Sequence, residues 1–547
     1  MQKQWVLRKK VSDNLKEQLL SCRNIKIEPD YDNDLRDPLD LLNMEKAVRR
    51  IISAIKNNDK IVIFSDYDAD GVSAAAIFYE FFKKINFENF HVHIPDRHLD
   101  GYGLTLESID EFTGQKAKLL ITLDCGITDC NEVKKAVNAG MDVVIIDHHL
   151  VPEILPPALA IVDPKQKDDK YPFKEFCGAG LAFKTIQAII NKGEFEVVPG
   201  WEKWLLDIVA IATIADMVPL VDENRVLVYY GLMVLKKTKR TGLLALFRRL
   251  GFTLPNINED DISFMIAPRI NITSRMSHAS ASFELLTTES IQEADWIASR
   301  MEALNVERKS AVEKILKEIE IKLADKKEIP AVIVAGDLTW NTGILGLTAT
   351  RLAEKYDRSV FLWGKERAKE IKGSCRSDGT INLVELMENL PLDMVFDFGG
   401  HTMAGGFSLP EDKINILEQG ILSAYEKIPK QKVENNILEI DAEIPLDDIN
   451  EEFYSVIEKF APFGVGNPKP VFLLKNLEIK NVKKFGNGGL HLQLDFKNIS
   501  AIGFFIASEE KYNLSVGQKI DLVATLEKSF FRASPELRLR IVDVKLN

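Results

Sequence analysis

The chain has 547 residues, of which 46% are hydrophobic and 28% are charged, and its formal net charge is −12 at pH 7. A chain of this length and composition can bury large cores in roughly three to four domains, which excludes intrinsic disorder and a disulfide-stapled mini-protein. The 31 glycines and 21 prolines are close to average, which excludes a collagen-like or low-complexity protein.

Two further features bear on location. The apolar runs are shorter than a membrane span, and residues 1–14 carry charge without an apolar stretch or a cleavage pattern, so we expect no signal peptide, no membrane association and a cytoplasmic protein. The five cysteines are widely scattered and form no CxxC pair, which favours reduced, buried thiols over a disulfide framework or a Cys-ligated zinc site.

Strand and helix signals alternate along the first 230 residues. Apolar residues at helical spacing predict a helix over 48–55, and a short apolar run at 61–64 is followed by a buried helix over 73–82. This rhythm predicts an α/β domain with a parallel sheet covered on both faces. The remaining strand candidates are 91–95, 119–123, 143–146 and 158–162.

The second half of the chain changes character twice. Residues 291–325 lack Gly and Pro and predict one long helix, which leads to a second α/β segment that begins at 331. Residues 430–436 have the composition of a linker. From about 437, period-2 alternation at 490–496, 519–526 and 537–544 predicts a small all-β barrel or sandwich. Residues 471–547 carry 12 Lys and Arg against 8 Asp and Glu, a local net charge of +4 on an acidic chain.

Acids follow three of the predicted parallel strands. Strand 61–64 leads to Asp66, Asp68 and Asp70; strand 119–123 leads to Asp124; and strand 143–146 leads to Asp147, His148 and His149. Open α/β sheets bind ligands outside the carboxyl ends of their strands, so these acids should converge on one crevice. A single Asp after a strand is commonly a helix N-cap, but three such clusters are harder to explain in that way.

The composition of this cluster favours a metal site. Asp68 and Asp70 can grip one metal or bridge two, and Gly71 permits a tight turn into the following helix. Asp216 follows an apolar helical run and could reach the same crevice, although a helix-end role would explain it if it stood alone. Aspartate and histidine without cysteine suit Mn²⁺ or Mg²⁺, and two such ions can support phosphoester hydrolysis.

The motifs SDYDADG, LDCG, IDHH and ADMVPL, in that order, resemble the four motifs of the DHH phosphoesterase superfamily. The segment 399–409 (GGHTMAGGFSL) resembles the glycine-rich signature of the companion DHHA1 domain. The segment 462–472 (PFGVGNPKPVF) with the β-rich tail resembles the OB-fold part of the RecJ family of single-strand-specific exonucleases. The resemblance covers nearly the whole chain.

The resemblance implies a metal-dependent 5′→3′ exonuclease that hydrolyses single-stranded DNA to 5′-mononucleotides in DNA repair and recombination. It implies two Mn²⁺ or Mg²⁺ ions. Asp147 and Asp66 would orient the metal ligands without binding the metal themselves. His149 would act in catalysis or contact phosphate. The implied metal ligands, which are also catalytic, are Asp68, Asp70, Asp124, His148 and Asp216.

The resemblance also implies a set of substrate-binding positions. Arginine offers a planar fork of donors that suits phosphate oxygens. Ser374 and Arg376 would form part of a pocket for the terminal 5′-phosphate, and Arg269 is a further cationic candidate near Arg275. An ordinary surface ion pair is a serious alternative for any one of these arginines. The expected substrate-binding residues are Arg97, Arg275, Ser374, Arg376, Gly399, Gly400 and His401.

Four positions depart from the family's pattern, and two of them are Asp163, where many relatives have Asn, and Phe64, where some have an additional His. Ser274 stands where relatives have Gly, and Asn341 stands where many have His. We expect these departures to affect substrate affinity more than catalysis. In the tail, Phe485, Phe530 and Phe531 lie beside lysines, and a core role and a base-stacking role are about equally plausible for each.

The predicted organisation has four parts: a catalytic DHH domain (1–230), a helical connector with the long helix (231–330), a substrate-binding DHHA1 domain (331–432) and an OB-fold-like strand-binding domain (433–547). Single-stranded DNA is the expected partner of a monomer, with a single-strand-binding protein and a RecQ-type helicase as implied protein partners. Two alternatives stay open: a DHH phosphoesterase on short oligonucleotides or nucleotide bisphosphates, and a non-catalytic DHH scaffold.

Overall fold

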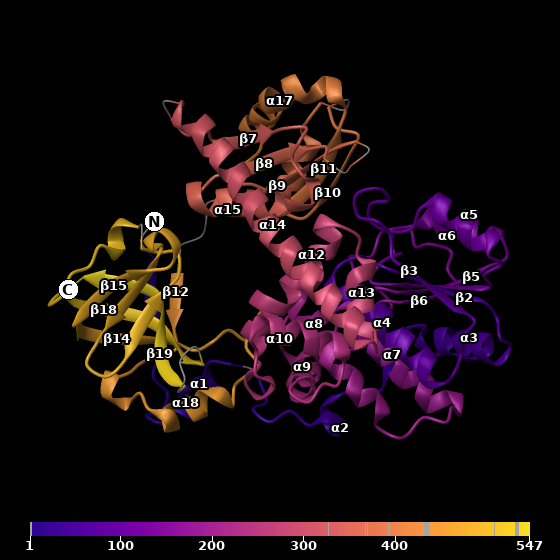
Figure 1. The fold of residues 1–547 in the computed structure, drawn as a ribbon, viewed down its shortest axis with the longest axis horizontal. Helices are drawn as coiled ribbons and strands as arrows, with labels where there is room; N and C mark the ends of the chain where they lie inside the picture. Colours follow the sequence, from indigo (N-terminus) through magenta and orange to yellow (C-terminus); the bar gives the residue numbers. More distant parts are fainter. Residues whose placement is uncertain are drawn as a thin grey trace. The chain divides into compact units, whose positions relative to one another are not determined.

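The computed structural model describes residues 3–23, 25–326, 328–366, 368, 370–391, 394–430, 437–507, 509–530 and 535–546. The chain divides into two compact units, whose helices and strands are labelled in Figure 1. Unit 1 comprises Met1–Leu35, Pro219–Tyr229 and Glu434–Asn547, and unit 2 comprises Arg36–Val218 and Tyr230–Val433. The predicted linker beyond Lys430 and the predicted domain boundary between 432 and 433 lie outside the described residues.

The first half of unit 2 contains the predicted parallel sheet. Its five strands run in the order β3-β2-β4-β5-β6, and every neighbouring pair is parallel. β2 and β4 are buried along their whole length, as expected for central strands covered on both faces. The strands are β2 (Ile61–Ser65), β3 (Phe90–His93), β4 (Leu119–Leu123), β5 (Asp142–Ile146) and β6 (Ala160–Val162). The fold class predicted for this region is confirmed.

Helices cover both faces of this sheet (Figure 1). One face packs on α5 and α6, where Phe64, Ile109, Phe112 and Val133 share a buried apolar cluster. The other face packs on three helices that also contact one another. The covering helices are α5 (Leu106–Gly114), α6 (Cys130–Asn138), α3 (Met44–Lys56), α4 (Ala69–Lys84) and α7 (Gly178–Gly193).

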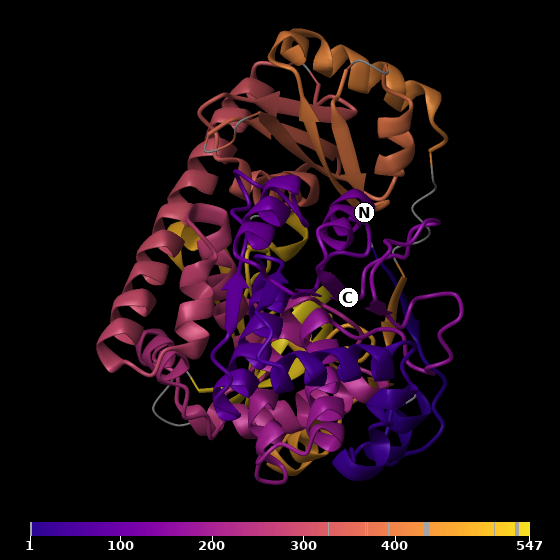
Figure 2. The ribbon, with the colours of Figure 1, turned by 90° about the vertical axis from the view of Figure 1, so that its right-hand side faces the viewer.

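A group of helices follows the sheet, and the longest of them matches the prediction closely. α14 spans Ile291–Ala324, and the side chain of Ser290 caps its first turn by accepting a hydrogen bond from Glu293 N. Figure 2 shows α14 leading to the second sheet of unit 2. The helices before it are α8 (Leu206–Ala215), α9 (Asp222–Leu235), α10 (Thr241–Leu250), α11 (Glu259–Asp261), α12 (Ala267–Met276) and α13 (Ser280–Thr287).

The second sheet is mixed. Its order is β10-β11-β9-β8-β7, in which only β7 and β8 run parallel. Cys375 and Phe407 point into a core with α17, so the alternating neighbours of Cys375 point toward α15. The elements are β7 (Val332–Gly336), α15 (Thr342–Tyr356), β8 (Ser359–Gly364), β9 (Ile371–Arg376), α16 (Leu383–Glu388), β10 (Asp397–Gly400), β11 (Ala404–Leu409) and α17 (Ile414–Lys427).

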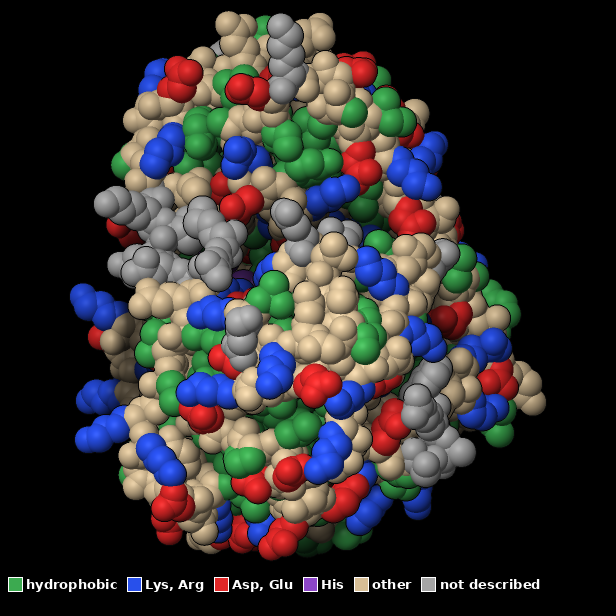
Figure 3. Space-filling model, turned by 90° about the vertical axis from the view of Figure 1, so that its left-hand side faces the viewer, with side chains coloured by type: hydrophobic (Ala, Val, Ile, Leu, Met, Phe, Trp, Pro, Cys, Tyr) green, Lys and Arg blue, Asp and Glu red, His purple; other side chains and the backbone are tan. Residues whose placement is uncertain are grey.

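Unit 1 contains the predicted all-β region. Seven strands follow the order β13-β14-β18-β19-β17-β16-β15 around a buried apolar core. On the face seen in Figure 3, Lys and Arg are interspersed with Asp and Glu, so charge alone marks no single site there. The elements are β12 (Ile437–Ile440), β13 (Ala442–Glu443), α18 (Glu451–Glu458), β14 (Val471–Glu478), β15 (Asn481–Phe485), β16 (His491–Asp495), β17 (Ser500–Gly503), β18 (Lys519–Ser529) and β19 (Glu536–Leu546).

The N-terminal segment belongs to the same unit. β1 (Gln4–Leu7) pairs in parallel with β12, and Leu19 of α1 (Leu15–Ser21) lies in the core of the β-rich region. The short helix α2 (Tyr31–Asp34) follows. The sequence analysis predicts residues 1–35 as part of the first domain. It does so because the sequence of a four-residue strand does not reveal a partner strand more than 400 residues away.

All five cysteines are free, and Cys125, Cys177 and Cys375 are buried. Within the part of the chain that the structure describes, every helix is too short or too polar to span a bilayer.

Candidate functional site

The turn after β2 is built around Asp68. This residue is the N-cap of α4, and its Oδ1 accepts hydrogen bonds from Asp70 N at 2.8 Å and Gly71 N at 3.1 Å. A Cβ on Gly71 would lie 2.4 Å from the carbonyl oxygen of Asp66, so only glycine permits this close return of the chain. The DADG segment therefore folds so that three carboxylates leave the end of one strand.

The predicted convergence of the strand ends is present. His148 Nε2 lies 3.0 Å from Asp124 Oδ1 and 3.8 Å from an Oδ2 atom of both Asp70 and Asp216. Asp216 comes from the end of α8, where it is the C-cap. Asp66, Asp68 and Asp124 form an adjoining group whose ligand atoms lie within 4.8 Å of one another. Asp124 therefore belongs to two neighbouring groups, an arrangement that could hold two cations.

Asp70 and Asp124 are positioned by the start of α7. Asp70 Oδ2 accepts from Gly178 N at 2.6 Å, and its Oδ1 accepts from Ala179 N at 2.7 Å. A Cβ on Gly178 would lie 2.6 Å from Asp124 Cβ. Asp124 itself adopts a φ of +62°, a conformation uncommon outside glycine. The sequence prediction missed this support, although the Gly-Ala-Gly start of a buried helix is a signal of close backbone approach.

The carboxylates of this cluster lie so close together that a positive charge would stabilise them. Burial, with a smaller effect of Asp68, raises the pKa of Asp70 to about 7, and burial with the charge of Asp70 raises the pKa of Asp216 to about 8. Burial also holds the pKa values of Asp66 and Asp124 well above their ordinary range. Among the described residues, Asp66 Oδ1 and Asp124 Oδ1 are buried and accept no hydrogen bond. These residues fit a divalent cation with oxygen and imidazole ligands.

His148 and His149 have different surroundings. Burial lowers the pKa of His148 to about 3, with a further effect of the neighbouring His149, so its imidazole is neutral and can donate a lone pair. Burial opposes the charge on His149, but its 2.7 Å hydrogen bond to Asp147 Oδ1 raises its pKa to about 9. Asp147 also accepts from the backbone N–H groups of Ile127 and His148 at 3.0 and 2.8 Å.

Cationic side chains lie on the nearby elements of unit 2. Burial and the charges of Arg97, Arg308 and Arg376, partly offset by the charge of Asp68, lower the pKa of Arg275 to about 10, so the net field at Arg275 is of like charge. Arg97 lies over the ring of Tyr67 at 5.0 Å. Arg269, by contrast, is paired with Glu302 on α14 at 2.6 Å, and this partly buried ion pair gives it a structural role.

Two of the departures from the family pattern, Ser274 and Asn341, have local partners. Ser274 is buried in α12 and donates its hydroxyl to the carbonyl oxygen of Asn271 at 3.1 Å. Asn341 is the N-cap of α15 and accepts from Gly343 N at 2.8 Å. Asn271 also accepts from Ala69 N at 2.8 Å, which ties α12 to the turn that carries Asp68 and Asp70.

Ser374 and Arg376 lie side by side on β9. Arg376 Nη1 donates to Ser374 Oγ at 3.2 Å, and Arg376 Nε donates to Thr350 Oγ1 on α15 at 3.2 Å. A Cβ on Gly346 of α15 would lie 2.8 Å from Arg376 Nη2 and 3.1 Å from Ser374 Oγ. The glycine therefore leaves room at the start of α15 for the guanidinium and the hydroxyl.

The glycine-rich segment lies at the end of β10. Gly400 has a φ of +147°, and a Cβ there would lie 2.5 Å from the carbonyl oxygen of Ala404, so glycine is required. A Cβ on Gly399 would meet no atom within 4 Å. His401 is exposed, and among the described residues its side chain makes no hydrogen bond or ion pair. The structure therefore does not bring His401 into contact with the acidic cluster.

Unit 1 carries an aromatic cluster that includes the candidate Phe485, whose ring lies 5.1 Å from that of His491, and other members that the sequence prediction missed. The His491 ring lies 5.0 Å from the Phe504 ring and 4.6 Å from the Phe505 ring, and Arg540 lies over Phe504 at 4.1 Å. Phe505 is 70% exposed and has a φ of +61°. Two adjacent phenylalanines in GFF are the signal that could have found it. Phe531 lies outside the described residues.

Three family models match the chain: the DHH family, N-terminal domain, over residues 60–213; the DHHA1 domain over 329–427; and the RecJ OB domain over 440–543. The fold and the site thus define a protein of the DHH class with a DHHA1 domain and an OB domain. The chain is 30% identical over 555 residues to a Haemophilus influenzae protein named single-stranded-DNA-specific exonuclease RecJ, and the match covers 96% of this chain and 95% of that protein. The chain belongs to the RecJ family.

A further relative and two solved structures also match the chain. The Bacillus subtilis protein of the same name is 33% identical, and the match covers 94% of this chain but 65% of that protein, so the chain spans less than two thirds of its length. A crystal structure of Thermus thermophilus RecJ in complex with Mn²⁺ has the same fold, with a TM-score of 0.81 and 24% identity over all of this chain and 80% of that one. A structure of exonuclease RecJ bound to manganese is 29% identical, with a TM-score of 0.62, and covers 74% of this chain and 97% of that one.

Proposed function

We propose that this chain is a metal-dependent 5′→3′ exonuclease that hydrolyses single-stranded DNA to 5′-mononucleotides in DNA repair and recombination. The observation that carries the proposal is the cluster of Asp70, Asp124, His148 and Asp216, in which three carboxylates surround one imidazole and the buried Asp124 Oδ1 accepts no hydrogen bond among the described residues. Membership of the RecJ family supports the reaction and the substrate.

Asp68, Asp70, Asp124, His148 and Asp216 are the proposed ligands of two Mn²⁺ or Mg²⁺ ions, and Asp66 completes the adjoining acidic group. Bound ions of this kind lower the pKa of water and stabilise the attacking and leaving oxygens of a displacement at phosphorus. The backbone N–H groups of Gly178 and Ala179 hold the Asp70 carboxylate in a fixed orientation, which sets the geometry of the ligand set.

His149 supplies a proton-bearing imidazole beside the acids. Asp147 accepts from its Nδ1, so its Nε2 is free to donate to a phosphate oxygen while the ring is charged. Tyr102 contacts the same ring, with its hydroxyl 3.2 Å from Nδ1. We assign His149 to the reacting phosphate and Asp147 to the orientation and charge of His149.

Substrate binding falls to the cations of unit 2. Arg275 and Arg97 are proposed to neutralise phosphates close to the scissile bond, because they lie in one field of positive charge. Ser374 and Arg376 are proposed to bind the terminal 5′-phosphate in the space left by Gly346. Gly399, Gly400 and His401 remain proposed substrate contacts on the strength of the family motif.

Unit 1 is the proposed strand-binding part. Base stacking on aromatic rings and a nearby cation bind single strands with little sequence preference. Phe504, Phe505, His491 and Arg540 offer that combination on one surface. We also propose the four-part division at residues 230, 330 and 432, a cytoplasmic monomer, and a single-strand-binding protein and a RecQ-type helicase as partners.

The experiment that tests the proposal compares 5′-labelled long single strands, duplexes and dinucleotides in the presence of Mn²⁺. Release of mononucleotides from the 5′ end of long single strands, with little attack on duplexes, is the expected result. Cleavage of dinucleotides alone would favour the small-substrate phosphoesterase, and the absence of hydrolysis by the folded protein would favour the scaffold.

A further inference from the structure

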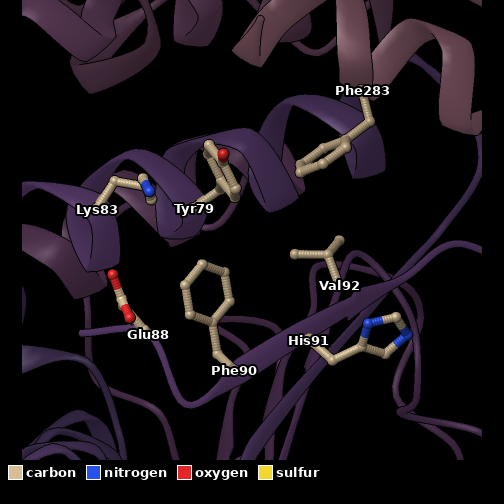
Figure 4. A pocket seen from close by; sticks show the side chains of 7 residues that line it. All are labelled: Tyr79, Lys83, Glu88, Phe90, His91, Val92 and Phe283. Atoms are coloured by element: carbon tan, nitrogen blue, oxygen red, sulfur yellow. The ribbon is translucent and has the colours of Figure 1, made fainter. Parts of the chain in front are cut away.

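The edge strand β3 carries two histidines on one side. Residues alternate across a strand, so Phe90 and Val92 point to one face, and His91 and His93 point to the other. Phe90 and Val92, together with part of His91, line a groove with Tyr79 of α4 and Phe283 of α13 (Figure 4). In that view the His91 ring points away from Tyr79 and Phe283. His93, on the same side of the strand as His91, lies against Phe112 of α5.

A carboxylate of α5 meets these imidazoles. One ligand atom each from His91, His93 and Glu111 lies within 4.8 Å of the others. Among the described residues, neither imidazole makes a hydrogen bond or an ion pair, and Glu111 accepts only from Gln115 Nε2 at 2.9 Å. The two histidine rings are 6.4 Å apart between centroids.

The His93 ring is held in place. It stacks on Phe64 at 5.5 Å and meets the edge of Phe112 at 5.2 Å. His91 and Glu111 are exposed, so their side chains can rotate at little cost. Donor atoms around a tetrahedral zinc ion lie about 3.3 Å apart, a spacing that rotation of the exposed glutamate can reach.

We propose that His91, His93 and Glu111 form a second divalent-metal site, separate from the acidic cluster and selective for Zn²⁺ over Mg²⁺. Two imidazoles and one carboxylate are a donor set that zinc prefers, with water in the fourth position. The acidic cluster, in contrast, offers mainly carboxylates, which suit harder ions. The assignment of this site does not rest on the proposed exonuclease activity.

The position of the site gives it a consequence. β3 ends at His93 and α5 begins at Leu106, so a metal shared by β3 and α5 joins the two elements that flank the loop of residues 94–105. That loop carries Arg97 over Tyr67, and Tyr102, whose hydroxyl lies 3.3 Å from the carbonyl oxygen of Asp124. Closing the base of a loop reduces its conformational freedom, so zinc should rigidify residues 94–105.

The test measures Zn²⁺ bound to the full-length protein by chelator competition, together with the visible spectrum of the Co²⁺ form. Because the acidic cluster contributes equally to all variants, the difference between them reports on the second site. We expect His91→Ala to bind one equivalent of Zn²⁺ fewer than the wild type. We expect Glu111→Gln to retain that equivalent but to bind it at least about tenfold more weakly. His491→Ala, in unit 1, removes a histidine elsewhere and should match the wild type.

The second measurement is hydrogen exchange of the amides of residues 94–105. Zn²⁺ should slow exchange there in the wild type and in His491→Ala, and should leave it unchanged in His91→Ala. His91 is exposed, so this variant should fold, and circular dichroism checks that it does. Equal Zn²⁺ stoichiometry and equal Co²⁺ spectra in the wild type and His91→Ala would overturn the site, and exchange unaffected by Zn²⁺ in the wild type would overturn the rigidifying role.

Discussion

His148 Nε2 lies 3.0 Å from Asp124 Oδ1, although the two residues follow different strands of the parallel sheet. β4 and β5 are neighbours, so their carboxyl ends meet at one edge of the sheet. His148 is also 3.8 Å from Asp70 and from Asp216, so this residue at the end of β5 links the acids of two other strand ends and one helix end. Loss of this imidazole or of Asp124 should therefore disable the whole cluster.

The first prediction concerns these two residues. His148→Ala and Asp124→Ala should each lower kcat/KM by more than about 100-fold. A substitution of a residue that only supports a metal ligand costs up to roughly 100-fold, and each of these variants removes a direct ligand. Mn²⁺ binding, measured by calorimetry, should weaken in parallel while circular dichroism stays unchanged. Asp447→Ala, at an exposed acid of unit 1, is the matched control and should keep both properties. Near-normal turnover in either folded site variant would exclude the proposed ligand set.

The second prediction concerns pH. The folded pKa values of about 7 for Asp70 and about 8 for Asp216 lie above the ordinary value of 3.8. The folded, metal-free protein therefore binds protons at these carboxylates more tightly than the unfolded chain does. Their contribution to stability is present at low pH and is lost as pH rises through these folded pKa values. The thermal midpoint of the metal-free protein should therefore decrease as pH is raised from about 6 to about 8, a range set by those two folded pKa values.

Metal binding should show the opposite dependence. Because the carboxylates must lose protons to act as ligands, Mn²⁺ affinity should rise across the same pH range and binding should release protons. Calorimetry in buffers of different ionisation enthalpy measures that release. Asp216→Asn should reduce both the fall in thermal midpoint and the proton release. A metal-free protein whose stability rises from pH 6 to pH 8 would contradict the assigned direction of these pKa shifts.

The third prediction concerns the pair Asp147 and His149. Asp147→Asn removes the charge that raises the pKa of His149, so that pKa should fall from about 9 toward or below the ordinary value of 6.5. Nuclear magnetic resonance of the imidazole measures it. If a charged His149 contacts phosphate, kcat/KM should fall about 10–100-fold, and the fall should be smaller at low pH, where the imidazole regains its proton. A loss independent of pH would indicate a purely structural role for Asp147.

The fourth prediction concerns the polarity of the reaction. A terminal 5′-phosphate carries more charge than an internal phosphodiester, and an Arg fork beside a hydroxyl can distinguish them. Arg376→Ala should reduce the preference for 5′-phosphate over 5′-hydroxyl strands, at a cost on the order of 2–5 kcal/mol. Arg376→Lys should recover part of it, because an ammonium keeps the charge but not the fork.

Two further variants sharpen this test. Gly346→Ala places a Cβ 2.8 Å from Arg376 Nη2, so it should disturb the same preference without removing the arginine. Arg49→Ala removes an exposed arginine of α3 and should leave the preference intact. If Arg376→Ala lowers kcat/KM equally on both strands, the residue that reads the terminus lies elsewhere.

The fifth prediction concerns the aromatic cluster of unit 1. Phe505→Ala should weaken binding to long single strands, because stacking contributes about 1–3 kcal/mol per base. Hydrolysis of dinucleotides should change much less. Fluorescence anisotropy with labelled strands measures the affinity, and Val516→Ala, at another exposed apolar residue of the unit, is the control. Equal losses on long and short substrates would contradict a strand-binding role.

Point substitutions are preferable to truncation in this unit. Removal of residues after about 435 would leave β1 without β12, and Leu19 without its apolar core. A truncated chain would therefore expose apolar surface, and its loss of activity would report on stability as well as on strand binding.

The sequence by itself determined the parallel sheet, the long helix and the chemical character of the site. Apolar runs of strand length predicted β2, β4 and β5, and the absence of Gly and Pro predicted α14 within a residue of its observed end. These are local signals, because periodicity and propensity act over a few neighbouring residues. The acids at the strand ends followed from a general property of parallel sheets, in which the carboxyl ends of the strands share one edge.

Tertiary structure decided which of the candidates act together. Arg269 and Arg275 stand six residues apart, yet only the fold pairs Arg269 with Glu302 and leaves Arg275 in a field of like charge. Three contacts join residues that are far apart in the sequence, in one case by more than 400 positions. They are the hydrogen bond from Gly178 N to Asp70, the space that Gly346 leaves for Arg376, and the pairing of β1 with β12. Such contacts depend on packing distances of a few ångströms, which no local pattern of residue types encodes.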